Sequence, residues 1–230
     1  MMNWIEEYQL FLFDFDGLLV NTEDLHYRAY KEMCANRGFN LDWSFERYCQ
    51  AAHYGARDVE KQIYERFPAL KEKEPHWPTL YAEKKQAYLN LLRKGQVELM
   101  PGAEKMLTLL EKAEVNRCVV TNSAEELVST IRKQNPILDS IPHWITREHY
   151  KEAKPSSECY EYAIEHLASK GAAVIGFEDS PRGITALQGT RAKAVLVTKI
   201  AYHDHDTFLE PDTLRYESME DLLELDILPV

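Results

Sequence analysis

The sequence lacks the features that would place it in several special classes of protein. Its four cysteines, Cys34, Cys49, Cys118 and Cys159, are widely separated, so they suggest neither a zinc site nor a small disulfide framework. The N-terminus has neither the basic start nor the long apolar core of a signal peptide, and no apolar run is long enough to span a membrane. These absences predict free, reduced thiols and a cytoplasmic protein.

Dense positive charge is also missing. Lys and Arg total 27 against 38 Asp and Glu, which gives a net charge of −11 at pH 7. Nucleic acid and anionic membranes are therefore poor candidate partners. An anionic small molecule would have to be held by a few local cations, by a metal ion or by backbone amides, because the overall field of the chain repels it.

The hydrophobic content, 45% of 230 residues, is enough for a substantial core. Five short apolar runs have the character of buried strands, and helical patterns separate the last four of them. The runs are Tyr8–Phe13, Arg117–Val120, His143–Ile145, Ala173–Phe177 and Ala194–Val197. This alternation predicts an α/β fold, a Rossmann-like doubly wound parallel sheet.

One connection in this pattern is unusually long. About a hundred residues lie between the first two strands, far more than a single crossover helix needs. They carry aromatic, leucine and charged residues at helical spacing. We therefore expect a core domain of residues 1–22 and 99–230 and an inserted α-helical cap of residues 23–98. Because both ends of the insertion return to neighbouring strand ends, we expect the cap to lie over the site that those ends form.

Two carboxylates follow the first strand. Asp14 and Asp16 are two residues apart, so the alternation of an extended chain places their side chains on the same side, and Gly17 allows the backbone to turn directly after them. Ligands of open parallel sheets bind at the carboxyl ends of the strands. The pair therefore marks a candidate site.

Polar residues follow the second strand as well. In Thr121-Asn122-Ser123, the hydroxyl and amide groups, together with backbone N–H groups at a helix start, are suited to hold phosphate oxygens. The alternative is structural, since Ser123 or Asn122 could instead cap that helix.

Charged residues mark two further segments. Lys154 precedes Pro155, which suits the first position of a helix, and is either a fixed cation at the same site or an exposed surface lysine. Glu178 and Asp179 follow the fourth strand and offer hard oxygen ligands of the kind that suits Mg²⁺. Asp179 could equally cap the helix that Pro181 begins.

In this order, the four segments resemble the four motifs of the haloacid dehalogenase (HAD) superfamily. They are Asp14-Phe-Asp16-Gly-Leu-Leu-Val-Asn-Thr22, Thr121-Asn122-Ser123, Lys154-Pro155 and Glu178-Asp179-Ser180-Pro-Arg-Gly183. The inserted helical segment is similar to the cap of the subgroup that holds phosphoglycolate phosphatase and β-phosphoglucomutase. The resemblance covers nearly the whole chain.

The resemblance implies a role for each matched residue. Asp14 would attack phosphorus and form an aspartyl-phosphate, and Asp16 would protonate the leaving oxygen and then activate water. Thr121 and the backbone amide of Asn122 would hold the phosphoryl group. Lys154 would hold Asp14 and offset the charge of the transition state. The acid at Asp16 favours phosphate chemistry over dehalogenation.

The resemblance also implies a metal cofactor, Mg²⁺. Asp14, the backbone carbonyl of Asp16 and Asp179 would bind it, and Glu178 would join them directly or through water. The implied activity is a magnesium-dependent phosphatase acting on a small phosphorylated metabolite. A β-phosphoglucomutase-like sugar phosphomutase is the alternative, and a non-catalytic sensor of phosphate or of a metabolite is a third hypothesis.

Substrate choice in this subgroup usually depends on the cap, and two cap residues are candidates. His26 matches a histidine of some mutase relatives, although a packed or surface histidine is the structural alternative. Arg57 follows a glycine as a basic residue does in mutases, but Tyr54 stands where those mutases carry a second basic residue. Near the C-terminus, His203-Asp204-His205-Asp206 contains residue types that bind metals. In an extended segment, however, neighbouring side chains point to opposite faces, so we predict a solvated loop here.

Overall fold

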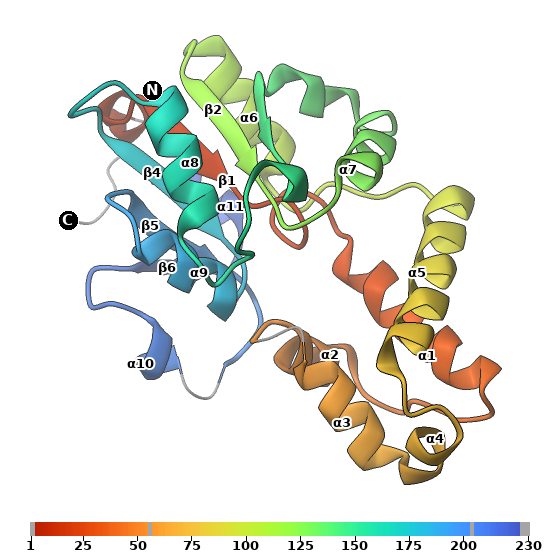
Figure 1. The fold of residues 1–230 in the computed structure, drawn as a ribbon. Helices are drawn as coiled ribbons and strands as arrows, with labels where there is room; N and C mark the ends of the chain where they lie inside the picture. Colours follow the sequence, from red (N-terminus) through yellow and green to blue (C-terminus); the bar gives the residue numbers. More distant parts are fainter. Residues whose placement is uncertain (1–2, 55–56, 203–204, 226–230) are drawn as a thin grey trace. The chain divides into compact units, whose positions relative to one another are not determined.

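The computed structural model describes residues 3–54, 57–202 and 205–225 (Figure 1). The chain divides into two compact units, Met1–Asn21 with Glu98–Val230, and Thr22–Val97. We call the first unit the core and the second unit the cap. The sheet belongs to the core, whereas the described residues of the cap form helices and their connections.

Within the described residues, a parallel sheet of six strands forms the centre of the core. The strands lie in the order β3-β2-β1-β4-β5-β6, and all neighbours pair in parallel. They are β1 (Leu10–Phe13), β2 (Asn116–Val120), β3 (His143–Ile145), β4 (Val174–Glu178), β5 (Lys193–Val197) and β6 (Leu214–Tyr216). The doubly wound α/β fold is thus confirmed, and each of the five predicted strands falls on one of β1 to β5.

The sequence does not predict β6. This strand is three residues long, lies at the edge of the sheet, and has half-buried and exposed side chains. It therefore lacks the continuous apolar run that marks a strand buried on both faces.

Within the described residues of the core, helices and short 3₁₀ turns accompany the strands. Helices α6, which begins directly after Pro101-Gly102, and α8 lie between strands, in agreement with the helical patterns that separate the predicted strands. His205 and Asp206, which we expect in a loop, begin α10, and His203 and Asp204 lie outside the described residues. The bounds are η1 (Asn3–Glu7), α6 (Ala103–Lys112), α7 (Glu125–Arg132), η2 (Pro136–Ser140), η3 (Arg147–His149), α8 (Glu158–Leu167), α9 (Pro181–Gln188), α10 (His205–Phe208) and α11 (Met219–Leu222).

Burial on both faces holds β1 at the centre of the sheet. Leu10 and Leu12 belong to an apolar cluster that includes side chains of α8 and α9. Phe11 and Phe13 point to the opposite face, where their rings stack against Phe177 of β4 with centroid distances of 6.2 and 5.1 Å. The residue that follows β1 is therefore fixed by packing on both sides of the sheet.

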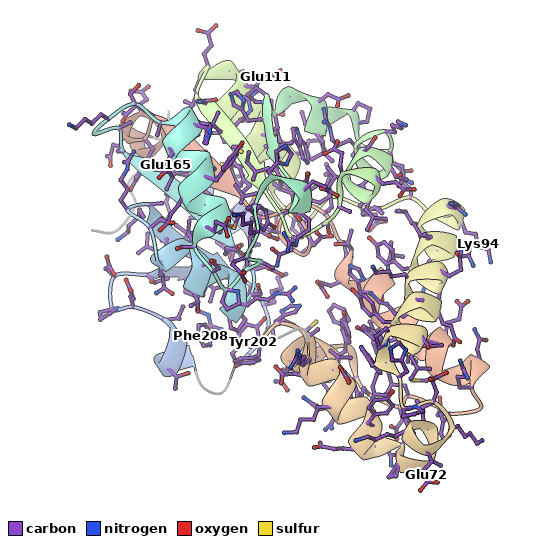
Figure 2. The ribbon with its side chains drawn as sticks, in the orientation of Figure 1. Glu72, Lys94, Glu111, Glu165, Tyr202 and Phe208 are labelled. Atoms are coloured by element: carbon purple, nitrogen blue, oxygen red, sulfur yellow. The ribbon has the colours of Figure 1, made fainter. Side chains whose placement is uncertain are left out.

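Close packing also positions the segments that follow β4 and β5. A Cβ at Gly176 would lie 2.5 Å from Leu187 Cδ1, so the glycine lets α9 approach β4 closely. After β5, the rings of Tyr202 and Phe208 meet edge to face with centroids 5.9 Å apart (Figure 2). All four cysteines are buried, and none of them forms a disulfide.

The described residues of the cap form five helices. They are α1 (Glu23–Asn36), α2 (Phe45–Ala52), α3 (Asp58–Arg66), α4 (Pro68–Lys73) and α5 (Trp77–Lys94). Aromatic contacts join α1 to α5, because Tyr30 stacks on Trp77 and His26 stacks on Tyr88, with centroid distances of 6.4 and 4.2 Å. No described helix of the protein is both long and apolar enough to cross a membrane.

Candidate active site

The first pair of carboxylates lies directly after β1. The Asp14 N–H donates to the Phe177 carbonyl at 3.0 Å, which extends the pairing of β1 with β4 by one residue, and the Asp14 side chain is buried. The chain turns at Gly17, whose φ of 85° is a left-handed conformation that suits glycine. The Gly17 N–H donates to the Val20 carbonyl at 2.9 Å. This turn keeps Asp14 and Asp16 at the carboxyl edge of the sheet.

Asp16 is held by the segment that follows β2. The Ser123 hydroxyl donates to Asp16 Oδ2 at 2.6 Å, and the Thr121 hydroxyl donates to the same oxygen at 3.1 Å. Helix α7 has Ala124 at its N-cap, so the alternative in which Ser123 or Asn122 caps this helix is wrong. The contact between Ser123 and Asp16 has no signature in the sequence, because a serine before a helix is usually a cap.

Asn122 is oriented by the loop that carries Lys154. Its Oδ1 accepts the Lys154 N–H at 3.2 Å and lies 2.7 Å from the Tyr150 hydroxyl. The same hydroxyl lies 2.7 Å from the Thr121 carbonyl oxygen. These contacts fasten the segment after β2 to the Lys154 loop.

Lys154 is buried, with 6% of its surface exposed, so the alternative of a surface lysine is wrong. Its Nζ lies close to four oxygens: Asp14 Oδ1 at 2.6 Å, Glu178 Oε1 at 2.7 Å, the Val120 carbonyl at 2.7 Å and the Tyr160 hydroxyl at 3.0 Å. The structure thus brings the lysine and the nucleophile candidate into direct contact across a chain separation of 140 residues.

The start of α8 fastens the loop that carries Lys154. The Glu158 carboxylate accepts the backbone N–H groups of Lys151 at 2.9 Å and Glu152 at 2.7 Å, which lowers the pKa of Glu158. Pro155 lies within this loop, and α8 begins only at Glu158. The expectation that Pro155 is the first helical residue is therefore wrong, because the helix starts where Glu158 turns back to the loop.

The end of β4 supplies two more acids. Glu178 and Asp179 are buried, and ligand oxygens of Asp14, Glu178 and Asp179 lie within 4.8 Å of one another. The Lys154 ammonium group contacts two of these three buried carboxyl groups, Asp14 and Glu178. A divalent cation would offset the negative charge of the cluster, and the hard carboxylate oxygens suit Mg²⁺. The donor set therefore fits a metal ion. Ser180 is the N-cap of α9, so the alternative of a capping Asp179 is wrong.

Burial and crowding shift the pKa values of the central pair. Burial raises the pKa of Asp14 to about 8, with a further increase from Glu178 and an opposing effect of Lys154. Burial alone would lower the pKa of Lys154, but the attraction of Asp14 and Glu178 outweighs it, so this pKa lies above its usual value. The lysine stays charged, and Asp14 needs additional positive charge to ionise fully at neutral pH.

His26, one of the two cap candidates, belongs to an aromatic cluster of α1 and α5. Its ring stacks on Tyr88, and its Nδ1 lies 2.6 Å from Lys84 Nζ. Lys84 is buried and faces the rings of Tyr30, Tyr81 and Tyr88 at 4.8 to 5.6 Å from their centroids. The sequence gives no sign of Lys84, because it lies between Glu83 and Lys85, in a run typical of a solvated helix face.

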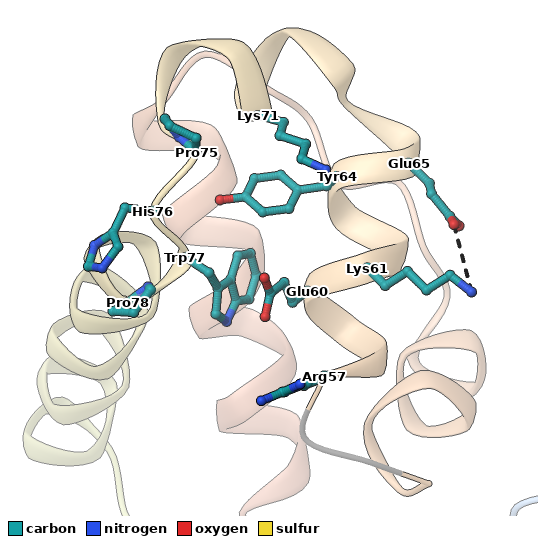
Figure 3. Close-up of a pocket in the computed structure, with 10 residues that line it drawn as sticks. All are labelled: Arg57, Glu60, Lys61, Tyr64, Glu65, Lys71, Pro75, His76, Trp77 and Pro78. Carbon is teal, nitrogen blue, oxygen red and sulfur yellow. Dashed lines mark ion pairs between the residues drawn. The ribbon is translucent and has the colours of Figure 1, made fainter.

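Arg57, the other cap candidate, lies just before α3 and lines a pocket of about 690 Å³ on the cap (Figure 3). Trp77 and Tyr64 form an aromatic wall of the pocket, with their rings edge to face at 5.4 Å. The other lining residues are Glu60, Lys61, Glu65, Lys71, Pro75, His76 and Pro78. His26 and Arg57 therefore have different neighbours within the cap.

Comparison with known proteins agrees with the class of enzyme that this fold and site suggest. The model of the haloacid dehalogenase-like hydrolase family matches residues 11–197. The chain therefore belongs to this family of hydrolases, and the resemblance seen in the motifs is confirmed.

The relatives extend over most of the chain. Protein CbbY of Rhodobacter capsulatus is 24% identical over 209 residues, which cover 90% of this chain and 92% of that protein. The Drosophila melanogaster protein named "Probable pseudouridine-5'-phosphatase" is 29% identical over 192 residues, or 81% of this chain and 80% of the relative. The structure of a predicted phosphoglycolate phosphatase from Haemophilus somnus matches with a TM-score of 0.77 and 19% identity, covering 95% of this chain and 97% of that one.

Proposed function

We propose that the protein is a magnesium-dependent phosphatase that hydrolyses a small phosphorylated metabolite through an aspartyl-phosphate on Asp14. The observation that carries the proposal is the 2.6 Å contact between Lys154 Nζ and Asp14 Oδ1, within a cluster of three buried carboxyl groups. Positive charge beside a buried carboxylate offsets the negative charge that accumulates when the carboxylate attacks a phosphate ester.

Asp14 and Asp16 divide the chemistry between them. In the first step a bond forms between an Asp14 carboxylate oxygen and phosphorus, and the bond between phosphorus and the ester oxygen breaks. Asp16 gives a proton to that leaving oxygen and then takes one from the water that hydrolyses the aspartyl-phosphate. The Ser123 and Thr121 hydroxyls, which both donate to Asp16 Oδ2, support this assignment because they hold the carboxyl group in one place.

Asp14, Asp179 and the backbone carbonyl of Asp16 would hold Mg²⁺, and Glu178 would join them directly or through water. When bound, the ion supplies the positive charge that keeps Asp14 ionised and neutralises phosphate oxygens. Lys154 keeps its contact with Asp14 throughout.

The Thr121 hydroxyl, on turning from Asp16 Oδ2 to a phosphoryl oxygen, and the backbone N–H of Asn122 would hold the phosphoryl group itself. Thr121 is buried directly after β2, and the Asn122 side chain is oriented by its contacts with Tyr150 and with the Lys154 loop. These contacts fix the backbone of the segment after β2 at the carboxyl edge of the sheet, where oriented N–H groups bind phosphate well.

The substrate proposal is a sugar-containing phosphate, such as a sugar phosphate or a nucleoside monophosphate. It is supported by the Drosophila relative, whose name describes a phosphatase of pseudouridine 5'-phosphate. We assign His26 and Arg57 to the selection of the part of the substrate beyond the phosphate. The free cysteines suit a reducing compartment, and on that ground we place the enzyme in the cytoplasm.

Phosphate release from a panel of phosphorylated metabolites, with and without Mg²⁺, tests this function. The wild type is compared with Asp14→Asn and with a control, Asp212→Asn, which changes an exposed aspartate of the core. Release that requires both Mg²⁺ and Asp14, and that survives in the control, supports the phosphatase.

Other outcomes contradict it in distinct ways. Phosphate release that persists in Asp14→Asn removes the proposed nucleophile. Isomerisation of a hexose phosphate without net phosphate release identifies a phosphomutase. Binding of a metabolite without any turnover identifies a sensor.

A further inference from the structure

The core contains a buried tyrosine hydroxyl to which the reaction above assigns no role. Tyr160 of α8 has no exposed surface, and its hydroxyl donates to Glu178 Oε1. The same hydroxyl lies 3.0 Å from Lys154 Nζ. It therefore contacts both the lysine that holds Asp14 and an acid of the carboxyl cluster.

The number of donors on Lys154 explains what this hydroxyl does. An ammonium group has three N–H groups, and three oxygens lie closer to Nζ than Tyr160 does: Asp14 Oδ1 at 2.6 Å, Glu178 Oε1 at 2.7 Å and the Val120 carbonyl at 2.7 Å. The Tyr160 oxygen is the fourth and longest contact, so its main hydrogen bond is the one that it donates to Glu178. Glu178 Oε1 thus receives two hydrogen bonds, one of them from a charged group.

The other oxygen of Glu178 is confined by the start of α9. The Asp179 N–H lies 3.3 Å from Glu178 Oε2, and a Cβ on Gly183 would lie only 1.9 Å from this oxygen. The Glu178 carboxyl group is therefore fixed from two sides, by Tyr160 and Lys154 at one oxygen and by α9 at the other.

We infer that Tyr160 is a positioning residue of the metal site, whose hydroxyl holds Glu178 where Asp14, Glu178 and Asp179 can share one divalent cation. The inference rests on the proposed function. Without this hydroxyl, Oε1 of Glu178 depends on Lys154 alone, and the ammonium is drawn toward Glu178 at the expense of its contact with Asp14. Hydrogen bonds that orient metal ligands typically change metal affinity or activity by about 10- to 100-fold.

The variant Tyr160→Phe removes the hydroxyl and keeps the ring. Calorimetric titration of Mg²⁺ into the purified protein measures binding without turnover, and we expect the dissociation constant to rise about 10-fold or more. At saturating Mg²⁺, kcat falls while KM for the phosphate ester stays within about twofold, because Thr121 and Asn122 are untouched. The matched control is Tyr162→Phe on the same helix, where the ring stacks on His166, and there Mg²⁺ binding stays unchanged.

A double-mutant cycle shows whether Tyr160 acts through Glu178. In a Glu178→Gln background, adding Tyr160→Phe changes the Mg²⁺ dissociation constant by less than about twofold if Glu178 carries the effect. Two results overturn the inference: Mg²⁺ affinity of Tyr160→Phe equal to that of the wild type, or losses that multiply in the double variant, which would reflect packing around the ring.

A second variant covers the case in which Tyr160→Phe does not fold. Gly183→Ala displaces the same Glu178 carboxyl group from the α9 side, and it is expected to weaken Mg²⁺ binding. Failure of the proposed function has a separate signature. If the wild type binds Mg²⁺ but releases phosphate from no ester, the phosphatase is ruled out while the titrations still decide the role of Tyr160.

Discussion

The core and the cap each bury a lysine, and the surroundings of the two lysines differ. In the core, Lys154 Nζ lies within 2.7 Å of carboxylate oxygens of Asp14 and Glu178. In the cap, Lys84 Nζ lies over the faces of three tyrosine rings and 2.6 Å from His26 Nδ1. The core lysine therefore contacts acids that we assign to catalysis and metal binding, whereas the cap lysine lies against tyrosine rings and a histidine.

This difference shows where the protein needs fixed geometry. The energy of a buried ammonium–carboxylate pair depends strongly on distance and on hydrogen-bond alignment, whereas a cation over an aromatic face tolerates lateral shifts. The partners of Lys154 include groups at the ends of β1, β2 and β4, whose relative positions the parallel pairing sets. Those of Lys84 include side chains of α1 and α5. Groups held at strand ends thus have the fixed geometry that the proposed phosphoryl transfer needs. Groups on helix faces suit the binding of a part of the substrate that varies.

Replacing the core lysine has the largest expected effect. Lys154→Met leaves Asp14 and Glu178 buried without their common cation, so the free energy of unfolding falls by about 3–5 kcal/mol. Turnover falls by about 10²- to 10³-fold or more, because transition-state charge loses a fixed partner. Urea denaturation and kcat on a phosphate ester measure the two effects. A variant with wild-type kcat would contradict the assigned role of Lys154.

A pH effect on stability comes next, and it concerns Asp14 of the core. Because the pKa of Asp14 is raised to about 8, the folded protein treated with a chelator holds a proton that the unfolded chain has lost above about pH 4. Its stability therefore falls as the pH rises from about 4 to about 8, and Mg²⁺ stabilises it most at the alkaline end of this range. Thermal unfolding with chelator and with Mg²⁺ measures both trends.

The matched control for this pH effect is Asp14→Asn, which cannot ionise. Its stability in chelator should be flatter between about pH 4 and pH 8 than that of the wild type. Equal slopes for the two proteins would assign the effect to other groups.

The cap lysine gives the smallest expected effect. Lys84→Met keeps most of the side-chain volume among aromatic rings, which accept a thioether well, so we expect a loss of no more than about 2 kcal/mol in unfolding free energy. With a small generic ester such as p-nitrophenyl phosphate, kcat stays within about threefold of the wild type, because the core acids keep their partners. If this variant lost as much turnover as Lys154→Met, the contrast between the two lysines would fail.

The sequence predicts the strands of the core better than it predicts the contacts between side chains. Buried parallel strands are continuous apolar runs, so β1 to β5 are visible in the sequence, whereas β6 at the sheet edge is not. Three of the motifs lie directly after β1, β2 and β4, and parallel pairing brings those strand ends to one edge. The position of Thr121 near Asp14 therefore follows from the order of strands and motifs along the chain, whereas Lys154 lies in the loop between η3 and α8.

Local sequence patterns do not predict the contacts between motifs. Ser123 and Lys154 each have an ordinary alternative, a helix cap and a surface lysine, and only burial and distance exclude these alternatives. No sequence pattern marks Tyr160 or Lys84, because a tyrosine or a lysine within a helix is common.

The sequence by itself determined the alternating α/β pattern, the long insertion after the first strand and the order of the four motifs, because periodicity and spacing are local properties of the chain. Only the tertiary structure decided which polar groups meet. Ser123 reaches Asp16 across 107 residues, and Lys84 reaches His26 across 58. Such contacts depend on the packing of whole elements, since a hydrogen bond needs its donor and acceptor within a few tenths of an ångström, and no local pattern encodes that distance.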